Sequence, residues 1–484
     1  MHDILPFAAV VAVAATALLA AAMSSRLSEW VRIPTPAIFL LAASLAAELV
    51  PRLGGLSIRA DQRIVTVALV LILFDGGMHV GLRRFRSAAR AVVWVGVAGT
   101  LVTAGVMAVA AHSLFGFEWR AALLIGTALA PTDPAVVFSV LGRREIQGRT
   151  GTLLEGESGA NDPVGIALMI SLLGASGGGW HAVGHRTIEF LAQMLVGGVF
   201  GVLGGHALRW LMRQVPMPNE ALYPLRTLAF GLLVYGVTTL CHGSGFLAVF
   251  LAGILVGDVR APYKREIERF SSAMSSLSEI VAFAVLGLSI PIGRAFGHGW
   301  AWTELGMAAV LILVARPVFV GLVLTPIRLR RGERAFVLWS GLKGAVPILL
   351  GTYVLAEGGH RADETYAVIF VVVLASVVVQ GGLVPTLARL WRVPMRLVEP
   401  EPWALGMRFR DEPEGLHRFV VGAGSTADGA TIGDLPLDED VWISMVSRGG
   451  RLVQVRGTTV LRAGDEVLAL ASDDGVVSGF FREP

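Results

Sequence analysis

Long apolar stretches separated by short polar segments fill the chain from its start to about residue 396. Several approach the roughly 20 residues that an α-helix needs to cross the hydrocarbon core of a bilayer. The pattern predicts an all-α, multi-pass membrane domain over residues 1–396. We expect about thirteen spans, at 4–23, 36–50, 63–80, 90–112, 119–140, 152–174, 187–213, 224–240, 244–258, 276–291, 302–328, 335–355 and 365–391. Three of these stretches are short, so a total of twelve spans is the alternative.

Basic residues between the predicted spans indicate an orientation. With the N-terminus outside, 23 Arg and Lys residues fall at inside loops and seven at outside loops. Cytoplasmic loops of membrane proteins carry the excess of basic residues. The distribution therefore favours thirteen spans in the cytoplasmic membrane, an outside N-terminus and a cytoplasmic C-terminus.

The composition of the chain changes after Arg396. Residues 397–414 are rich in Pro, Glu and Arg, which is typical of a linker. Residues 415–484 contain strand-like runs at 417–422, 441–447, 452–455 and 466–471, with glycine-containing turns between some of them. We expect a linker over 397–414 and a small cytoplasmic α/β domain over 415–484.

Composition and charge agree with a membrane protein. Apolar residues make up 54% of the 484 residues and charged residues 16%, and the mean hydropathy is +0.67. The net charge of +3 reflects loop arginines, which argues against a nucleic-acid partner. A single cysteine, Cys241, excludes an intramolecular disulfide. The apolar start contains no Lys or Arg, so we expect a retained first span and not a signal peptide.

Two acidic clusters interrupt the apolar stretches, Ala130-Pro131-Thr132-Asp133-Pro134 and Gly156-Glu157-Ser158-Gly159-Ala160-Asn161-Asp162-Pro163. An ionisable residue in a span costs a few kcal/mol, so three acids grouped in this way indicate a function. On a helix, Ser158 and Asp162 share one face and Glu157 and Asn161 the next. Such oxygen ligands suit a monovalent cation whose place a proton can take. The alternative is a polar stripe buried against another helix.

Two helix breaks are predicted near mid-membrane. Pro131 and Pro134 flank Asp133, and the span at 335–355 has a matching break at Gly341-Leu342-Lys343-Gly344-Ala345-Val346-Pro347. Irregular backbone at this depth lines a cavity or is buried in protein, and broken helices that face a central site are typical of transporters. We expect the breaks to cross within inverted repeats. Asp133 would offset positive half-helix ends and Lys343 negative ones; a snorkelling lysine is the alternative.

Arg316, Asp75 and Glu279 are further ionisable residues within predicted spans. Arg316 needs an anion, and we expect Glu157 to be its partner, which leaves Asp162 to exchange a proton. A position facing a water-filled funnel is the alternative for Arg316. Asp75 and Glu279 either line an access path or lie at helix ends.

Two motifs in the chain mimic other functions. Gly156-Glu157-Ser158-Gly159 fits the pattern of rhomboid-like serine proteases, but neither His206 nor His242 is obviously placed as a general base. Gly422-Ala423-Gly424-Ser425-Thr426-Ala427 mimics a dinucleotide loop, but too few residues follow for a full nucleotide-binding domain. We favour neither function.

The membrane motifs together resemble those of NhaP-type monovalent cation:proton antiporters. The resemblance covers about residues 4–396 and is carried by Thr132-Asp133-Pro134, Glu157-Ser158-Gly159-Ala160-Asn161-Asp162, Arg316 and Gly341-Leu342-Lys343-Gly344-Ala345. It implies an NhaA-like inverted-repeat fold of thirteen helices with two broken crossing helices. It also implies a homodimer and alternating access by an elevator-like movement of the core bundle.

The resemblance also implies roles for single residues. The ion would be surrounded by Asp162, Ser158, Glu157 and the Thr132 carbonyl, with Asn161 and Arg316 holding Glu157. An Asn161-Asp162 pair in place of two aspartates is similar to the electroneutral branch, which moves one proton per cation. Lys343 departs from the arginine that is common there in animal relatives.

Residues 415–484 resemble the regulatory C-terminal module of potassium-uptake and potassium-channel proteins, called TrkA-C or RCK-C. The matching features are Gly429-Ala430-Thr431-Ile432-Gly433-Asp434-Leu435, the Arg448-Gly449-Gly450 turn and Arg462-Ala463-Gly464-Asp465. The resemblance implies a small-molecule regulator and favours K⁺ over Na⁺.

The sequence thus predicts a secondary antiporter, not an enzyme, that exchanges K⁺, or less favourably Na⁺, for H⁺. No tightly bound cofactor is expected. The expected partners are the transported ions, membrane lipid and a second copy of the chain. A cation channel gated by the tail is the main alternative, and the lack of a recognisable selectivity-filter loop argues against it.

Overall fold

A computed structural model describes residues 34–50, 57–141, 144–146, 148–174, 180–290, 293, 301–358, 361–397, 416–437, 441–449, 451–471 and 479–481. The chain divides into two compact units, Met1–Pro400 and Glu401–Pro484. The predicted span at 4–23 and nearly all of the predicted linker lie outside the described residues.

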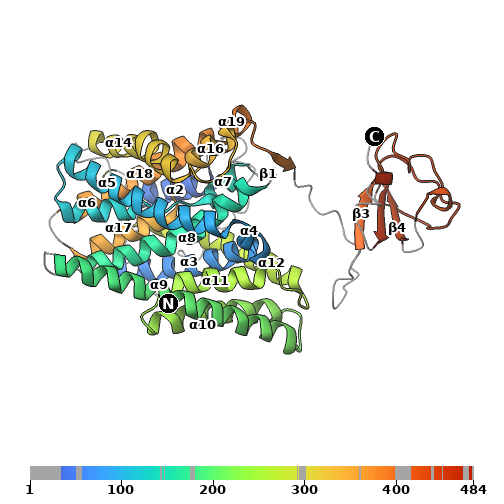
Figure 1. Ribbon diagram of the computed structural model, residues 1–484, viewed down its shortest axis with the longest axis horizontal. Coiled ribbons are helices and arrows are strands. Elements are labelled where there is room, and N and C mark those ends of the chain that lie inside the picture. The colour runs from blue at the N-terminus through green and yellow to red at the C-terminus, as the bar shows by residue number, and fades with distance from the viewer. Residues whose placement is uncertain are drawn as a thin grey trace. The chain divides into compact units, whose positions relative to one another are not determined.

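Helices form the first unit (Figure 1). In chain order they are α2 (Thr35–Leu49), α3 (Ile58–Val80), α4 (Leu82–Val93), η2 (Trp94–Gly99), α5 (Thr100–Phe115), α6 (Trp119–Ala128), α7 (Pro134–Leu141), α8 (Arg149–Leu173), α9 (Trp180–Gln214), α10 (Leu222–Leu240), α11 (Gly245–Gly257), α12 (Lys264–Leu288), α14 (Ala301–Val310), η3 (Leu311–Val320), α15 (Gly321–Val323), α16 (Arg331–Trp339), α17 (Ala345–Glu357), α18 (Ala362–Ala375), η4 (Ser376–Gln380) and α19 (Gly381–Leu390).

Local sequence signals set several helix ends. The Ser57 and Ser244 side chains accept hydrogen bonds from the first turns of α3 and α11, as N-caps do. Gly81, with φ of +64°, separates α3 from α4, and Gly116, with φ of +72°, ends α5. Three π-helical segments, η2, η3 and η4, lie within otherwise α-helical spans. Such segments often mark functional sites.

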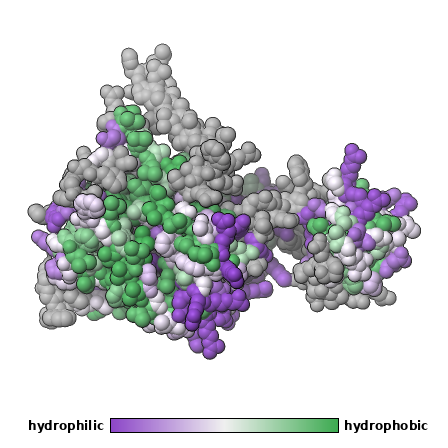
Figure 2. Space-filling view, turned by 90° about the horizontal axis from the view of Figure 1, so that it is seen from above, coloured by the Kyte–Doolittle hydropathy of each residue, from purple (hydrophilic) through white to green (hydrophobic). Residues whose placement is uncertain are grey.

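The predicted membrane domain is confirmed as a helical bundle. Six helical segments in the described residues are long and apolar enough to cross a bilayer, and α2, α11 and α17 are shorter apolar helices. Large apolar side chains point outward, among them Leu195 of α9, Leu240 of α10 and Trp302 of α14. Figure 2 shows a broad hydrophobic area on one face of this unit, with hydrophilic residues beside it. A surface of this kind suits contact with lipid tails.

A two-stranded antiparallel sheet lies within the first unit. β1 (Arg144–Ile146) lies between α7 and α8, and β2 (Met395–Leu397) follows α19. Glu145 is opposite Arg396 in the register. The sequence pattern did not predict this pairing, because it joins segments about 250 residues apart and each strand has only three residues.

The second unit contains a four-stranded antiparallel sheet in the order β3-β6-β4-β5. The strands are β3 (Leu416–Val420), β4 (Trp442–Arg448), β5 (Arg451–Val453) and β6 (Glu466–Leu470), close to the four predicted runs. Arg448 donates to both carboxylate oxygens of the buried Asp465, at 2.8 and 2.6 Å. These hydrogen bonds hold the pKa of Asp465 below its usual range. The segment after β3 forms turns and not the helix that a dinucleotide loop requires.

Candidate ion-binding site

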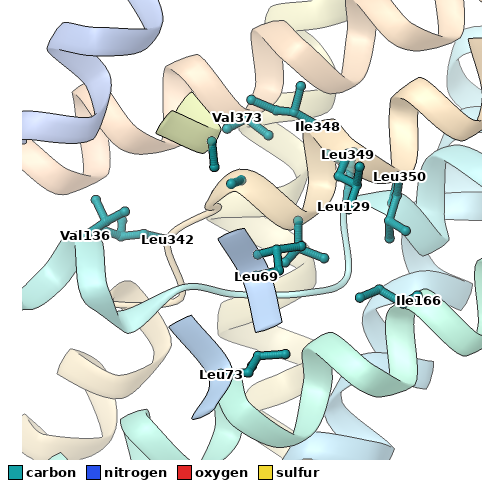
Figure 3. Packing of buried hydrophobic residues seen from close by; sticks show 14 of the residues in the cluster. Leu69, Leu73, Leu129, Val136, Ile166, Leu342, Ile348, Leu349, Leu350 and Val373 are labelled. Carbon is teal, nitrogen blue, oxygen red and sulfur yellow. The ribbon is translucent and has the colours of Figure 1, made fainter. Parts of the chain in front are cut away.

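Both predicted helix breaks are present, and they contact each other. Residues 129–133 separate α6 from α7, and residues 340–344 separate α16 from α17. The Asp133 N–H donates to the Leu342 carbonyl at 2.8 Å. Figure 3 shows Leu129 and Leu342 of these two segments among apolar side chains of α3, α17 and α18. The non-helical backbone is thus buried in protein, which is one of the two surroundings that tolerate it at membrane depth.

Opposite charges lie at the ends of the broken helices. Asp133 Oδ1 accepts from Ala135 N at 2.8 Å, at the start of α7. Lys343 Nζ donates to the Ala130 and Pro131 carbonyls, at 3.1 and 2.9 Å, just beyond the C-terminal end of α6. A carboxylate is favourable at a helix N-terminus and an ammonium at a C-terminus. Because the Lys343 side chain is fully buried, the snorkelling alternative is wrong.

Arg316 and Glu157 form a buried ion pair. Arg316 Nη2 lies 3.1 Å from Glu157 Oε1, and the two side chains are 2% and 5% exposed. The same guanidinium donates to the carbonyls of Leu338, at 3.1 Å, and Val337, at 3.4 Å, in the last turn of α16. The predicted contact is therefore present, and the water-filled funnel is excluded as the surrounding of Arg316.

Asn161 contacts a different partner from the one expected. Its Nδ2 donates to Thr132 Oγ1 at 2.7 Å, and its role in holding Glu157 is not supported. The physical reason is that α8 faces two structures at this level. Glu157 is directed at η3 and α16, whereas Asn161, one turn further along, meets the first helix break. Asn161 therefore joins α8 to Thr132, one of the predicted ion ligands.

Asp162 and Ser158 are buried next to these contacts. The two residues are 7% and 6% exposed. Among the residues that the structure describes, neither side chain has a hydrogen-bond partner. The Asp162 carboxylate interacts electrostatically with Asp133 and Lys343. The structure thus brings Thr132, Asp133, Glu157, Ser158, Asn161, Asp162, Arg316 and Lys343 into one region where two helix breaks meet α8.

Asp75 and Glu279 lie on α3 and α12, two helices that pack against each other. Asp75 Oδ1 accepts from Ser272 Oγ at 3.2 Å and lies 3.5 Å from His79 Nδ1. Glu279 interacts electrostatically with Asp133, and its buried Oε1 has no hydrogen-bond partner in the described part of the chain. These positions fit a path that leads to the site, and that role stays a prediction.

Some buried polar residues were missed by sequence reasoning. Asp61 and Glu304 are 3% and 2% exposed, and each has a buried oxygen without a partner among the described residues. Ser376 and Gln380 lie within the last span and contact the second break. Gln380 could have been noticed, since it follows the apolar run that ends in Val377-Val378-Val379.

His206 is exposed on α9, and its Nδ1 lies 2.8 Å from the Val202 carbonyl, which does not suit a general base for Ser158.

Comparison with known proteins gives strong matches to both units. Residues 13–390 match the family described as "Sodium/hydrogen exchanger, transmembrane", and residues 416–478 match the TrkA-C domain. The protein named K⁺/H⁺ antiporter NhaP from Alkalimonas amylolytica is 37% identical over 377 residues, which cover 77% of this chain and 64% of that protein. The chain thus spans less than two thirds of that relative's length.

A second relative covers almost the whole chain. The K⁺/H⁺ antiporter NhaP2 from Shewanella oneidensis is 32% identical over 470 residues, which cover 95% of this chain and 80% of that protein. A solved structure titled as the sodium proton antiporter MjNhaP1 from Methanocaldococcus jannaschii has a TM-score of 0.64 at 21% identity and covers 77% of this chain and 98% of its own. That structural likeness supports the fold. The chain belongs to the sodium/hydrogen exchanger family, in its NhaP-type form with a C-terminal TrkA-C domain.

Proposed function

We propose that this protein is a secondary antiporter that exchanges a monovalent cation for protons, with Asp162 as the shared carrier. The observation that supports it best is the contrast between two acids on α8. Glu157 is paired with Arg316, whereas Asp162 is buried with no hydrogen-bond partner among the described residues. An unpaired buried carboxylate is costly in a membrane. Either a proton or a cation relieves this cost, so the two ligands compete.

The surroundings of Asp162 suit a small, hard cation. Ser158 supplies a hydroxyl one turn away, and the first break supplies Thr132. Lys343 takes up the Ala130 and Pro131 carbonyls, which leaves Thr132 as the next carbonyl toward Asp133. The cation would thus be held by Asp162, Ser158 and the Thr132 carbonyl. Glu157 would contribute its second oxygen, which is buried and has no protein partner in the described region.

We infer that K⁺ is preferred to Na⁺ and that one proton moves per cation. Both curated relatives described above are named K⁺/H⁺ antiporters, although the solved structural relative is titled a sodium proton antiporter. The Asn161-Asp162 pair, in place of two aspartates, is similar to the electroneutral branch of the family, and this similarity supports one proton per cation. The preference is tested by comparing the half-saturating concentrations of K⁺ and Na⁺ for proton exchange.

We infer the orientation of the protein in the membrane from the charges of its loops. The excess of arginines at alternate loops supports a cytoplasmic C-terminus in the inner membrane, with the N-terminus outside. The TrkA-C domain would then be cytoplasmic, where it would regulate exchange by binding a small molecule. We also infer a homodimer in which the two tails associate. No tightly bound cofactor and no catalytic reaction are needed for this function.

Cation-dependent proton flux in everted membrane vesicles tests the proposal. Wild type should exchange H⁺ for K⁺, and for Na⁺ less well, with saturable rates. The Asp162→Asn variant should insert normally and lose exchange. Its neutral amide takes up no exchangeable proton and offers no negative charge to a cation. Glu304→Gln is a matched control that changes an equally buried acid on α14 and should keep exchange. Exchange by Asp162→Asn at the wild-type rate would refute the carrier role, and non-saturating cation flux without protons would indicate a channel.

A further inference from the structure

Two buried polar residues of the last span are not used by the proposed function. Ser376 and Gln380 are the first and last residues of η4, and they are 0% and 2% exposed. They follow α18, whose buried residues from Ala367 to Leu374 are all apolar. A buried polar group is costly unless it is hydrogen-bonded. The partners of their hydrogen bonds therefore show which part of the protein this segment contacts.

Both residues bind the second helix break, one at each end. Gln380 Nε2 donates to the Trp339 carbonyl at 3.2 Å, and Trp339 Nε1 donates back to the Gln380 carbonyl at 3.1 Å. Trp339 is the last residue of α16, so this contact satisfies a carbonyl that the helix leaves open. At the other end, the Lys343 N–H donates to Ser376 Oγ at 3.2 Å. Lys343 lies two residues before α17 begins.

A hydrogen bond between the two side chains joins these contacts. Ser376 Oγ donates to Gln380 Oε1 at 2.6 Å, so the hydroxyl and the amide form one chain from Trp339 to Lys343. The π-helical form of η4 is consistent with a functional site, because π-helical segments concentrate there.

We propose that Ser376 and Gln380 are positioning residues for ion exchange, an inference that rests on the proposed function. They fix both ends of residues 340–344 and thereby the Lys343 ammonium on the Ala130 and Pro131 carbonyls. The Leu342 carbonyl, which accepts from Asp133 N, is fixed by the same contacts. The first break then keeps the shape in which Thr132 and Asp162 bind the cation. Neither Ser376 nor Gln380 has to touch the ion for this role.

Exchange by the full-length protein in proteoliposomes tests this role, with the cation concentration and the pH varied. Ser376→Ala removes the acceptor for Lys343 N and the donor for Gln380. It should raise the half-saturating K⁺ concentration about fivefold and shift the pH profile, since losing one such hydrogen bond changes an equilibrium by about that factor. Ser376→Thr keeps the hydroxyl and should restore wild-type behaviour. Gln380→Met keeps the side-chain length without the amide and should act like Ser376→Ala.

The matched control is Ser44→Ala. Ser44 is equally buried, and its hydroxyl donates to the Ile290 carbonyl at 2.6 Å, between α2 and the end of α12. This variant should lower the melting temperature without moving the half-saturating concentration or the pH profile. The double variant Ser376→Ala/Gln380→Met should change the half-saturating concentration by less than the product of the single changes, because one chain is broken twice.

The outcomes separate this inference from the proposed function. Variants that melt at a lower temperature but keep the wild-type half-saturating concentration and pH profile would show a purely structural role. Effects that multiply in the double variant would show two independent contacts and also overturn the inference. If wild type moves no protons with K⁺ or Na⁺, the proposed function fails, and this inference fails with it. If wild type exchanges and only the variants disagree, the positioning role alone is wrong.

Discussion

At the scale of single residues, Glu157 and Asp162 show how position on one helix gives two acids different surroundings. They are five residues apart on α8 and almost equally buried, at 4% and 7% exposed. One turn of α8 faces the Arg316 guanidinium, whereas the next faces the first helix break. The sequence predicted the Arg316 partner correctly, because few anions lie within the spans. It predicted the wrong partner for Asn161, because spacing along one helix does not tell which neighbouring segment lies opposite.

The Arg316–Glu157 pair should matter mainly for stability. Arg316→Ala leaves a buried carboxylate without its cation and removes donors to the Leu338 and Val337 carbonyls. Breaking such a pair costs about 3–5 kcal/mol. We expect a low yield and a clear drop in melting temperature in detergent. Adding Glu157→Gln should restore part of the loss, since the unpaired charge disappears.

Arg120→Ala serves as the control for this prediction. Arg120 pairs with Glu357 on the surface, where its side chain is 61% exposed. A pair of that kind contributes about 0–1 kcal/mol, so its loss should leave the melting temperature almost unchanged. A double variant Arg316→Ala/Glu157→Gln that melts no higher than Arg316→Ala would contradict the explanation by an unpaired charge.

At the scale of elements, the sequence predicted both helix breaks but not everything that holds them. Pro131, Pro134 and the glycines at 341 and 344 are local signals, and the breaks lie where these residues lie. The π-helical segments were not predicted: η3 contains Pro317, but η2 and η4 contain no proline that would mark them. The same holds for the pairing of β1 with β2, which depends on segments that only the folded chain brings together.

Gly344 illustrates why the second break needs a residue without a side chain. A Cβ atom at this position would overlap the Asp133 carboxylate. The backbone φ of −104° is open to any residue, so the obstacle is space and not backbone strain. Gly344→Ala should force Asp133 away from the start of α7 and destabilise the protein by about 1–3 kcal/mol, as overpacking does. Exchange should fall more than the amount of folded protein.

Gly236→Ala is a suitable comparison for Gly344→Ala. Gly236 lies within α10, and a Cβ atom there meets no atom within 4 Å. Alanine favours a helix over glycine, so this variant should be as stable as wild type or slightly more stable, with normal exchange. Vesicle transport and melting temperature, measured side by side, check both variants. Normal exchange by Gly344→Ala would mean that Asp133 has more freedom than its surroundings indicate.

At the scale of the whole molecule, the chain joins a membrane unit of the sodium/hydrogen exchanger family to a small sheet domain. The composition alone separated the two, since a run of apolar spans gives way to short alternating strands after Arg396. β2 lies at the position of this change in composition. It pairs with β1 in the loop between α7 and α8. α7 follows the first break, and α8 carries Asp162. A segment leading toward the tail is therefore attached directly to the loop between two site elements.

Removing the tail should change regulation and not abolish exchange. The second unit has its own core, built from residues such as Phe419, Val446 and Val467, and its strands are too short and too polar to cross a bilayer. A chain that ends after Pro400 keeps β2 and should exchange cations for protons near the wild-type rate in vesicles. Its pH profile or its response to cytoplasmic solutes should change, because the TrkA-C domain is gone.

A second truncation separates the tail from its point of attachment. A chain that ends after Arg392 also lacks β2, so β1 loses its backbone partner. A two-stranded sheet is only marginally stable by itself, and β1 without β2 should not persist. If the attachment affects the site, this shorter chain should exchange more slowly than the one ending after Pro400 at equal amounts of inserted protein. Equal rates would show that β2 is dispensable. Complete loss of exchange by the longer chain, correctly inserted, would mean that the tail belongs to the transport machinery, because nothing in the membrane unit itself would have been removed.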